Sequence, residues 1–242
     1  MNILQTNTIS VTSIYEHEYT FGRLMAVAIA EKLTKYGFTY TNPYSNDYHV
    51  FWNDQPVFVV SGQASTTKCA IRIAARYNKS MTATWGSTYE FGSVKSTSTA
   101  EQTVSLDIAF FTTATGAYIS FTGISDVISC TCVSLDGEES AMHVKYTQGY
   151  SVPLIVLDKE STGNASTESW SWTYKTNDVS CAEPSRCFVT PRAGLVRNKL
   201  VEYTLDHVIQ VESSATYTAG QVVTIDGEKY VYCRDKLFMR MN

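Results

Sequence analysis

Acid–base chemistry needs titratable side chains that reach one substrate atom, and two short segments of this chain place such residues together. Glu16, His17 and Glu18 are consecutive, and Asp206 precedes His207. A histidine between carboxylates at a helix start could act as an acid–base group. Such a histidine more often belongs to a charged surface cluster. In a strand-like run neighbouring residues point to opposite faces, so Asp206 and His207 cannot act on one atom. Neither segment predicts an active site.

Sequence signatures of catalysis are absent. The chain has no G-x-S-x-G elbow, no phosphate-binding glycine loop, no G-x-G-x-x-G and no H-E-x-x-H. A hydrolase acting on cell wall or DNA is the weakest hypothesis, because the sequence offers neither a nucleophile nor a paired acid. We therefore predict that the protein is not an enzyme and uses no cofactor.

Sugar binding is the chemistry that one aromatic segment could perform. Trp170, Trp172 and Tyr174 alternate with small polar residues, so a strand would place all three on one face. Flat aromatic faces at strand spacing can stack on sugar rings. An aromatic stripe of this kind belongs to a hydrophobic core or a subunit contact more often than to a sugar site. A sugar site also needs amide or carboxylate groups nearby, for which Glu168 and Asn177 are candidates.

The cysteines and histidines do not follow a metal-binding pattern. Six cysteines and four histidines are scattered without a Cys-x2-Cys pair. Cys130 and Cys132 share one face if their segment is a strand, which favours a structural role. Cys181 and Cys187 bracket Pro184 and are able to close a small disulfide in an oxidising medium, whereas a cytoplasmic product would keep them reduced. We expect no metal site.

Composition excludes several kinds of partner. The formal net charge of -4 provides no basic stripe, so we expect no direct nucleic-acid binding. No run of about 18 apolar residues predicts a membrane span. Residues 1–7 lack the cationic and apolar regions of a secretory signal, so we expect synthesis in a cytoplasm.

The balance of polar residues favours permanent association. Charged residues make up only 17% of the chain, so Ser, Thr, Asn and the sixteen tyrosines must supply much of the polar surface. Interface cores also replace hydrated charges with amphipathic aromatic residues. The alternative is that any β-rich protein uses Thr and Tyr heavily.

One core helix is predicted near the start of the chain. Apolar residues recur at helical spacing from Phe21 to Leu33, and Gly37 is placed to end the helix. Thr20 is a plausible N-cap. A capping box at Ser13–Glu16 allows an earlier start, which would make Gly22 a weak point inside the helix.

Period-two patterns follow this helix and predict antiparallel hairpins. The paired segments are 48–52 with 56–60, 104–111 with 118–121, and 132–135 with 142–146, and residues 69–77 and 81–85 extend the first pair. Residues 86–103 are rich in Ser, Thr and Gly, which predicts an exposed arm or a disordered loop. Residues 161–167 predict a long loop or a boundary between lobes.

The last hairpin is the clearest element. Asp226-Gly227 favours a two-residue type I′ turn. This turn pairs Ile225 with Glu228 and Val223 with Tyr230, so Val223, Ile225, Tyr230 and Tyr232 share one face, and Val222, Val231 and Cys233 share the other. Because both faces are partly apolar, we expect the following segment 237–241 to be covered by the fold or by a neighbouring subunit.

This ending, 220–232 with 237–241, resembles the β-hairpin endings common among small structural proteins of tailed bacteriophages. Residues 21–36 followed by 48–60 are similar to the opening of tail-terminator and neck proteins, in which one helix lies on an antiparallel sheet that assembles into rings. From about Tyr118 onward the chain departs from the compact terminators. The resemblance implies a virion protein. It does not specify whether the protein belongs to the neck, the tail, the baseplate or the capsid.

These observations predict an α+β fold, predominantly antiparallel β, with one principal N-terminal amphipathic helix packed on a sheet. We expect a helix-plus-sheet lobe over residues 1–160 and a β-rich lobe over 161–242, or one domain containing both. The predicted function is a non-enzymatic component of a tailed-phage virion that forms a ring or another symmetric assembly with its own copies and with other virion proteins. The alternative is a carbohydrate-binding or host-adhesion module that uses Trp170, Trp172 and Tyr174.

Overall fold

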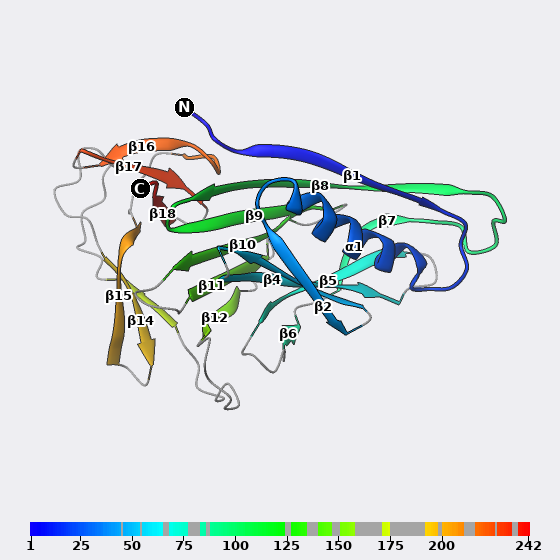
Figure 1. The fold of residues 1–242 in the computed structure, drawn as a ribbon, viewed down its shortest axis with the longest axis horizontal. Coiled ribbons are helices and arrows are strands. Elements are labelled where there is room, and N and C mark those ends of the chain that lie inside the picture. Colours follow the sequence, from blue (N-terminus) through cyan, green and yellow to red (C-terminus); the bar gives the residue numbers. More distant parts are fainter. Residues whose placement is uncertain are drawn as a thin grey trace.

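The computed structural model describes most of the chain and places its regular elements in three antiparallel sheets and one helix (Figure 1). The described residues are 1–44, 46–53, 55–64, 68–76, 83–85, 88–123, 127–134, 140–146, 151–157, 171–174, 192–197, 200–210, 216–225, 227–233 and 237–242. Within them the predicted fold class is confirmed: the structure is dominated by antiparallel β-sheet, and its helix packs on a sheet.

The first sheet has the strand order β1-β8-β9-β10-β11-β12. Its strands are β1 (Gln5–Ser13), β8 (Gln102–Thr113), β9 (Gly116–Thr122), β10 (Val127–Ser134), β11 (Ser140–Tyr146) and β12 (Ser151–Leu157). The second sheet has the order β2-β3-β4-β5-β6, with β7 also pairing with β5. Its strands are β2 (Thr39–Tyr44), β3 (Asp47–Trp52), β4 (Gln55–Gln63), β5 (Lys68–Arg76), β6 (Ala83–Trp85) and β7 (Tyr89–Ser93).

The third sheet has the order β13-β14-β15-β18-β17-β16. Its strands are β13 (Ser171–Tyr174), β14 (Arg192–Arg197), β15 (Leu200–Gln210), β16 (Val222–Ile225), β17 (Glu228–Tyr232) and β18 (Leu237–Arg240). Residues 161–167, predicted as a loop or boundary, lie outside the described residues. The division of the chain near residue 160 therefore stays a prediction.

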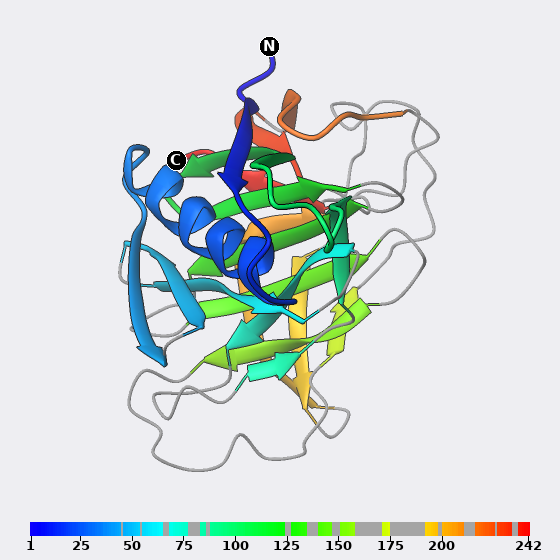
Figure 2. The same cartoon turned by 90° about the vertical axis from the view of Figure 1, so that its right-hand side faces the viewer.

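Helix α1 (Thr20–Thr34) fills the space between β1 and the second sheet (Figure 2). Its buried face includes Met25, Ile29 and Leu33. These side chains join one core that also contains Ile9 from β1, Leu106 from β8 and Ile71 from β5. The apolar face that predicted a core helix therefore packs against strands of both the first and the second sheet.

The ends of the helix differ in how well the sequence predicted them. The earlier start at Ser13 is wrong, because Ser13 belongs to β1, and the N-cap position is Tyr19. Thr20 is the first helical residue, and its hydroxyl donates a hydrogen bond to the His17 carbonyl at 2.8 Å. The helix end is confirmed: Gly37 has a φ of 88°. Its N–H and that of Phe38 donate to the carbonyls of Thr34 and Leu33, forming a Schellman motif.

Two glycines let the first turn of α1 approach the backbones of β4 and β5 closely. A Cβ atom on Gly62 would lie 2.5 Å from the Arg23 nitrogen, and one on Gly22 would lie 2.5 Å from the Ala70 oxygen. Gly22 was expected to weaken the helix. Instead, the missing side chain allows the helix to approach the sheet closely.

Most of the predicted hairpins are confirmed. β3 pairs with β4, β8 with β9 and β10 with β11, all antiparallel, and β5 extends the second sheet. The interpretation of 86–103 as an arm or loop is wrong for residues 89–93, where β7 pairs with β5 and buries Tyr89 and Phe91 in the core. Residues 94–101 form a largely exposed loop, as predicted.

The outward face of the long strand β8 meets two environments. Near its start, Thr103, Ser105 and Asp107 are exposed. Further along, Phe111 is buried and stacks on Tyr118 of β9, with ring centroids 5.1 Å apart. The Thr113 hydroxyl lies 3.0 Å from the sulfur of Met239 in β18. The third sheet therefore covers one end of this face and leaves the other end open.

The C-terminal hairpin has the predicted register. Ile225 pairs with Glu228 and Val223 with Tyr230, and Gly227 has a φ of 84°. One face forms a second core from Ile225, Tyr230 and Phe238, with Val223 and Tyr232 packed against it. On the other face Val231 and Cys233 are buried. The expectation that the last strand is covered is confirmed, because Phe238 and Met239 are fully buried.

Candidate interaction surface

The predicted aromatic stripe lies largely beyond what the structure describes. Trp170 lies outside the described residues, as do Glu168 and Asn177. Trp172 and Tyr174 are in β13, whose backbone pairs with β14 opposite Leu195 and Ala193. The expected strand is therefore present, and the use of its aromatic side chains stays a prediction.

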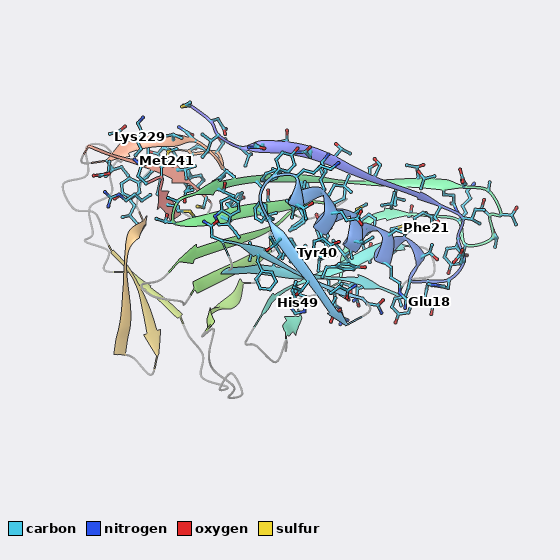
Figure 3. The ribbon with its side chains drawn as sticks, in the orientation of Figure 1. Glu18, Phe21, Tyr40, His49, Lys229 and Met241 are labelled. Atoms are coloured by element: carbon cyan, nitrogen blue, oxygen red, sulfur yellow. The ribbon has the colours of Figure 1, made fainter. Side chains whose placement is uncertain are left out.

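The predicted acid–base cluster forms a turn before α1. Glu16, His17 and Glu18 are all exposed. The Nδ1 atom of His17 accepts a hydrogen bond from the Tyr19 N–H at 3.1 Å. Glu18 lies at this end of the helix near Phe21, far from Lys229 and Met241 (Figure 3). This geometry is that of the charged surface cluster. Asp206 and His207 are consecutive in β15, as predicted.

Two cysteines have described side chains, and both are buried free thiols. Burial raises the pKa of the Cys69 thiol to about 11. Burial also raises the pKa of Cys233 far above its ordinary value. Cys130 and Cys132 lie in β10, whereas Cys181 and Cys187 lie outside the described residues.

Among the residues whose side chains are described, no group of three or more His, Cys, Asp or Glu is arranged to hold a metal ion. The helix in the described part of the chain is not long and apolar enough to cross a membrane.

The open part of the first sheet is the most distinctive described surface. It is formed by the outward side chains of β1 and the first half of β8, and we call it the hydroxyl face. All of its members are exposed: Thr6, Thr8, Ser10, Thr12, Thr103, Ser105 and Asp107. Asp107 is the only charged residue among the seven.

Cross-strand hydrogen bonds hold the hydroxyl face in order. The Thr8 hydroxyl donates to Asp107 Oδ1 at 2.6 Å. The Ser10 and Ser105 hydroxyls lie 2.7 Å apart, and so do those of Thr12 and Thr103. These pairs follow the register of β1 on β8. The result is a flat polar strip whose short side chains have few rotamers to lose when a partner covers them.

A sequence signal for this face exists and was missed. Hydroxyl residues occupy every second position from Thr6 to Thr12 and alternate with Ile9 and Val11, which enter the core. Such alternation is typical of a half-buried strand.

A second feature joins the two ends of the chain. The residues before β1, Met1–Leu4, which we call the edge segment, lie along the start of β16 at the edge of the third sheet (Figure 1). Asn2 forms an isolated antiparallel bridge with Gln221. The N-terminal strand therefore continues from the edge of the third sheet to the edge of the first.

An aromatic pair lies on the second sheet beside the helix. The rings of Tyr40 in β2 and Tyr48 in β3 are half-buried, with centroids 5.9 Å apart and planes inclined at 56°. Burial, together with the nearby Tyr40 and Glu31, raises the pKa of Tyr48. Aromatic rings and a carboxylate, two kinds of group that a sugar site uses, therefore occur together at this position, although the two rings pack against the core and do not form one flat face.

Comparison with known proteins provides no relative: no family model, no curated protein and no solved structure matches this chain.

Proposed function

We propose that this protein is a non-enzymatic structural component of a tailed-phage virion that assembles by symmetric subunit contacts at the neck, tail or baseplate. The observation that supports assembly most directly is the hydroxyl face, an ordered and exposed sheet surface with one charge among seven outward residues. The assignment to a tailed phage rests on the resemblance of the helix–sheet opening and of the C-terminal hairpin to virion proteins.

The physical argument concerns what a solvent-facing sheet normally carries. Proteins protect exposed sheets and their edges with lysine and other charges, which keep them hydrated and block pairing. No lysine, arginine or glutamate lies among the outward residues of β1 or in residues 103–107 of β8. Covering this strip removes few strongly hydrated groups from water, so the cost of desolvation is low. A second β surface with free donors and acceptors would complement it.

Light scattering on the purified chain, repeated with particles or lysate of its source, tests the assembly. We expect an oligomer of the 26.9 kDa chain, or its incorporation into particles. Ser105→Lys places a charge in the middle of the hydroxyl face and should reduce the mass toward that of one chain. Thr41→Lys, at an exposed position of β2, is the matched control and should leave the mass unchanged. A wild-type protein that stays monomeric and does not bind to particles would overturn the proposal.

The second candidate function is carbohydrate binding, which the Tyr40–Tyr48 pair supports in addition to the predicted Trp170, Trp172 and Tyr174 stripe. A glycan array tests it. Tyr48→Ala would abolish binding at the tyrosine pair, and Trp172→Ala would abolish binding at the stripe. Thr41→Lys serves again as the control. An array without any hit, or hits that both alanine variants retain, would remove this alternative.

A further inference from the structure

We propose that the outer edge of β1 pairs in antiparallel orientation with the outer edge of β1 in a second copy of this chain, so that the first sheets of two subunits continue into one sheet. This inference rests on the proposed assembly and deepens it. The hydroxyl face supports contacts made by side chains, whereas the edge of β1 offers backbone groups and specifies which strand of the partner binds them.

The outer side of β1 carries no other strand. In the order β1-β8-β9-β10-β11-β12 it is the terminal strand, and its neighbour is β8. Among the described residues, residues 5–13 form no backbone hydrogen bond other than those to β8. β1 runs along the upper margin of the molecule in Figure 1, and α1 lies below it in both views (Figures 1 and 2). The outer edge is therefore open.

The pairing on the far side of β8 shows which backbone groups of β1 point outward. The two-residue turn between β8 and β9 closes on the pair Thr113–Gly116, whose N–H and C=O groups face each other. Such pairs alternate along a strand, and neither register of β8 contains a shift. The even-numbered residues of β8 therefore face the odd-numbered residues of β1. The outward backbone groups of β1 belong to its even-numbered residues: Thr6, Thr8, Ser10 and Thr12.

The hydroxyl contacts agree with this alternation. Opposite residues whose backbones are not hydrogen-bonded to each other lie closer together than those whose backbones are. Ser10 and Ser105 are opposite residues of this kind, and their hydroxyls lie only 2.7 Å apart. The even-numbered residues of β1 thus combine side chains on the hydroxyl face with backbone groups at the open edge.

This edge lacks the features that normally prevent pairing. Proteins protect edge strands by keeping them short, by adding lysine or proline, by a bulge or by a covering segment. β1 has nine residues, contains no charged residue and no proline, and follows β8 without a register shift. A long edge with unpaired donors and acceptors is a template for another strand.

A second copy supplies a matching strand, because β1 is complementary to itself. Full antiparallel overlap of two Gln5–Ser13 strands places Thr8 opposite Ser10 and Thr6 opposite Thr12, which brings the outward backbone groups of both strands together. On the hydroxyl face these pairs would repeat the kind of contact that Ser10 already makes with Ser105. No like charges are opposed, since the strand has none. The contact is two-fold symmetric and joins copies in pairs.

Amide hydrogen exchange of the full chain tests this pairing residue by residue. The N–H groups of Asn7 and Ile9 bond β8, so they should exchange slowly at every concentration. In associated protein, detected by light scattering, Thr8 and Ser10 should also be protected, by about tenfold or more relative to any monomer. Association that leaves Thr8 and Ser10 unprotected would overturn the edge pairing and leave the proposed assembly intact. A chain that never associates, alone or with particles, would overturn both.

Ser10→Pro tests the same contact through the backbone. Proline removes an N–H that does not bond β8, and its ring blocks the open edge. Ser10→Ala is the matched control, because it removes the hydroxyl and keeps the N–H. We expect Ser10→Pro to lower the mass of the associated protein and Ser10→Ala to leave it unchanged, with Ile9 still slow to exchange in both. Equal masses of the two variants would overturn the edge pairing. If Ser10→Pro loses the protection of Ile9, the exchange of the wild-type amides decides the question.

Discussion

At the scale of single residues, burial changes the pKa of the Cys69 thiol without making the thiol reactive. The residue lies in β5, is 3% exposed and belongs to the main core. Burial disfavours the thiolate, which raises the pKa of Cys69 to about 11. A thiol in this state is a poor nucleophile, so its contribution is to packing.

The raised pKa predicts a pH dependence of stability. A group whose pKa is raised on folding stabilises the native state below its ordinary pKa, and this contribution is lost as the pH rises. The loss should begin near pH 9 and continue to about pH 11. Cys69→Ala lacks this titration, so the stability gap between wild type and variant should narrow by about 1 kcal/mol between pH 8 and pH 10.

Urea unfolding at the two pH values measures this change. All other titrating groups are common to both proteins, so the difference isolates Cys69. A gap that stays constant or widens with pH would contradict the assigned shift.

At the scale of elements, the crossing of α1 over β4 determines how the helix is seated. Gly22 and Gly62 meet without side chains, and Gly62 would place a Cβ 2.7 Å from the Gly22 carbonyl carbon. Backbone atoms cannot move aside as a flexible side chain can. The first turn of the helix must therefore shift if either glycine gains a methyl group.

Gly62→Ala should destabilise the protein by about 3 kcal/mol, the upper part of the usual range for overpacking. Gly92→Ala is the matched control in β7, because its new Cβ would meet the Val104 side chain at 3.2 Å rather than backbone. Chemical denaturation of both variants measures the difference. Equal losses in the two variants would show that the helix accommodates the methyl group.

At the scale of the whole molecule, hydrogen bonds of the described residues join the third sheet to the first near its β1 edge and near the turn between β8 and β9, in addition to the packing of β13 beside β12. The edge segment forms the first of these hydrogen-bonded junctions, and the turn between β8 and β9 forms the second. There the Thr115 hydroxyl donates to the Arg240 carbonyl at 2.9 Å, and Met239 lies against Thr113. The C-terminal strand is thus anchored to the sheet that carries the hydroxyl face.

Met239→Ala should remove buried volume from this junction and destabilise the protein by about 3 kcal/mol. Met241→Ala, two positions further along and only half-buried, should cost less than about 1 kcal/mol. Differential scanning calorimetry compares the two variants with wild type. Equal transition temperatures for the two variants would mean that burial of Met239 at the junction stabilises the protein no more than Met241 does.

The sequence predicted those parts of the fold that depend on neighbours along the chain. An Asp-Gly turn determines the pairing of Val223 with Tyr230, because a two-residue turn sets hairpin register. The helix end at Gly37 follows from the conformation that only glycine adopts readily. The fold class follows from such local signals repeated along the chain.

Tertiary structure decided the features that depend on distant residues. The alternation from Thr6 to Thr12 indicates a strand, but not its partner: β8 begins almost ninety positions after β1 ends, and the hydroxyl pair of Thr8 and Asp107 spans 99 positions. Helix propensity alone makes Gly22 a weak point of a helix that begins near Ser13, whereas its role in close packing appears only when the folded chain brings Gly62 against it. The meeting of Asn2 with Gln221 is likewise invisible in any local pattern. Local propensity determines which elements form, whereas the packing of remote segments determines which of their faces stay open to a partner.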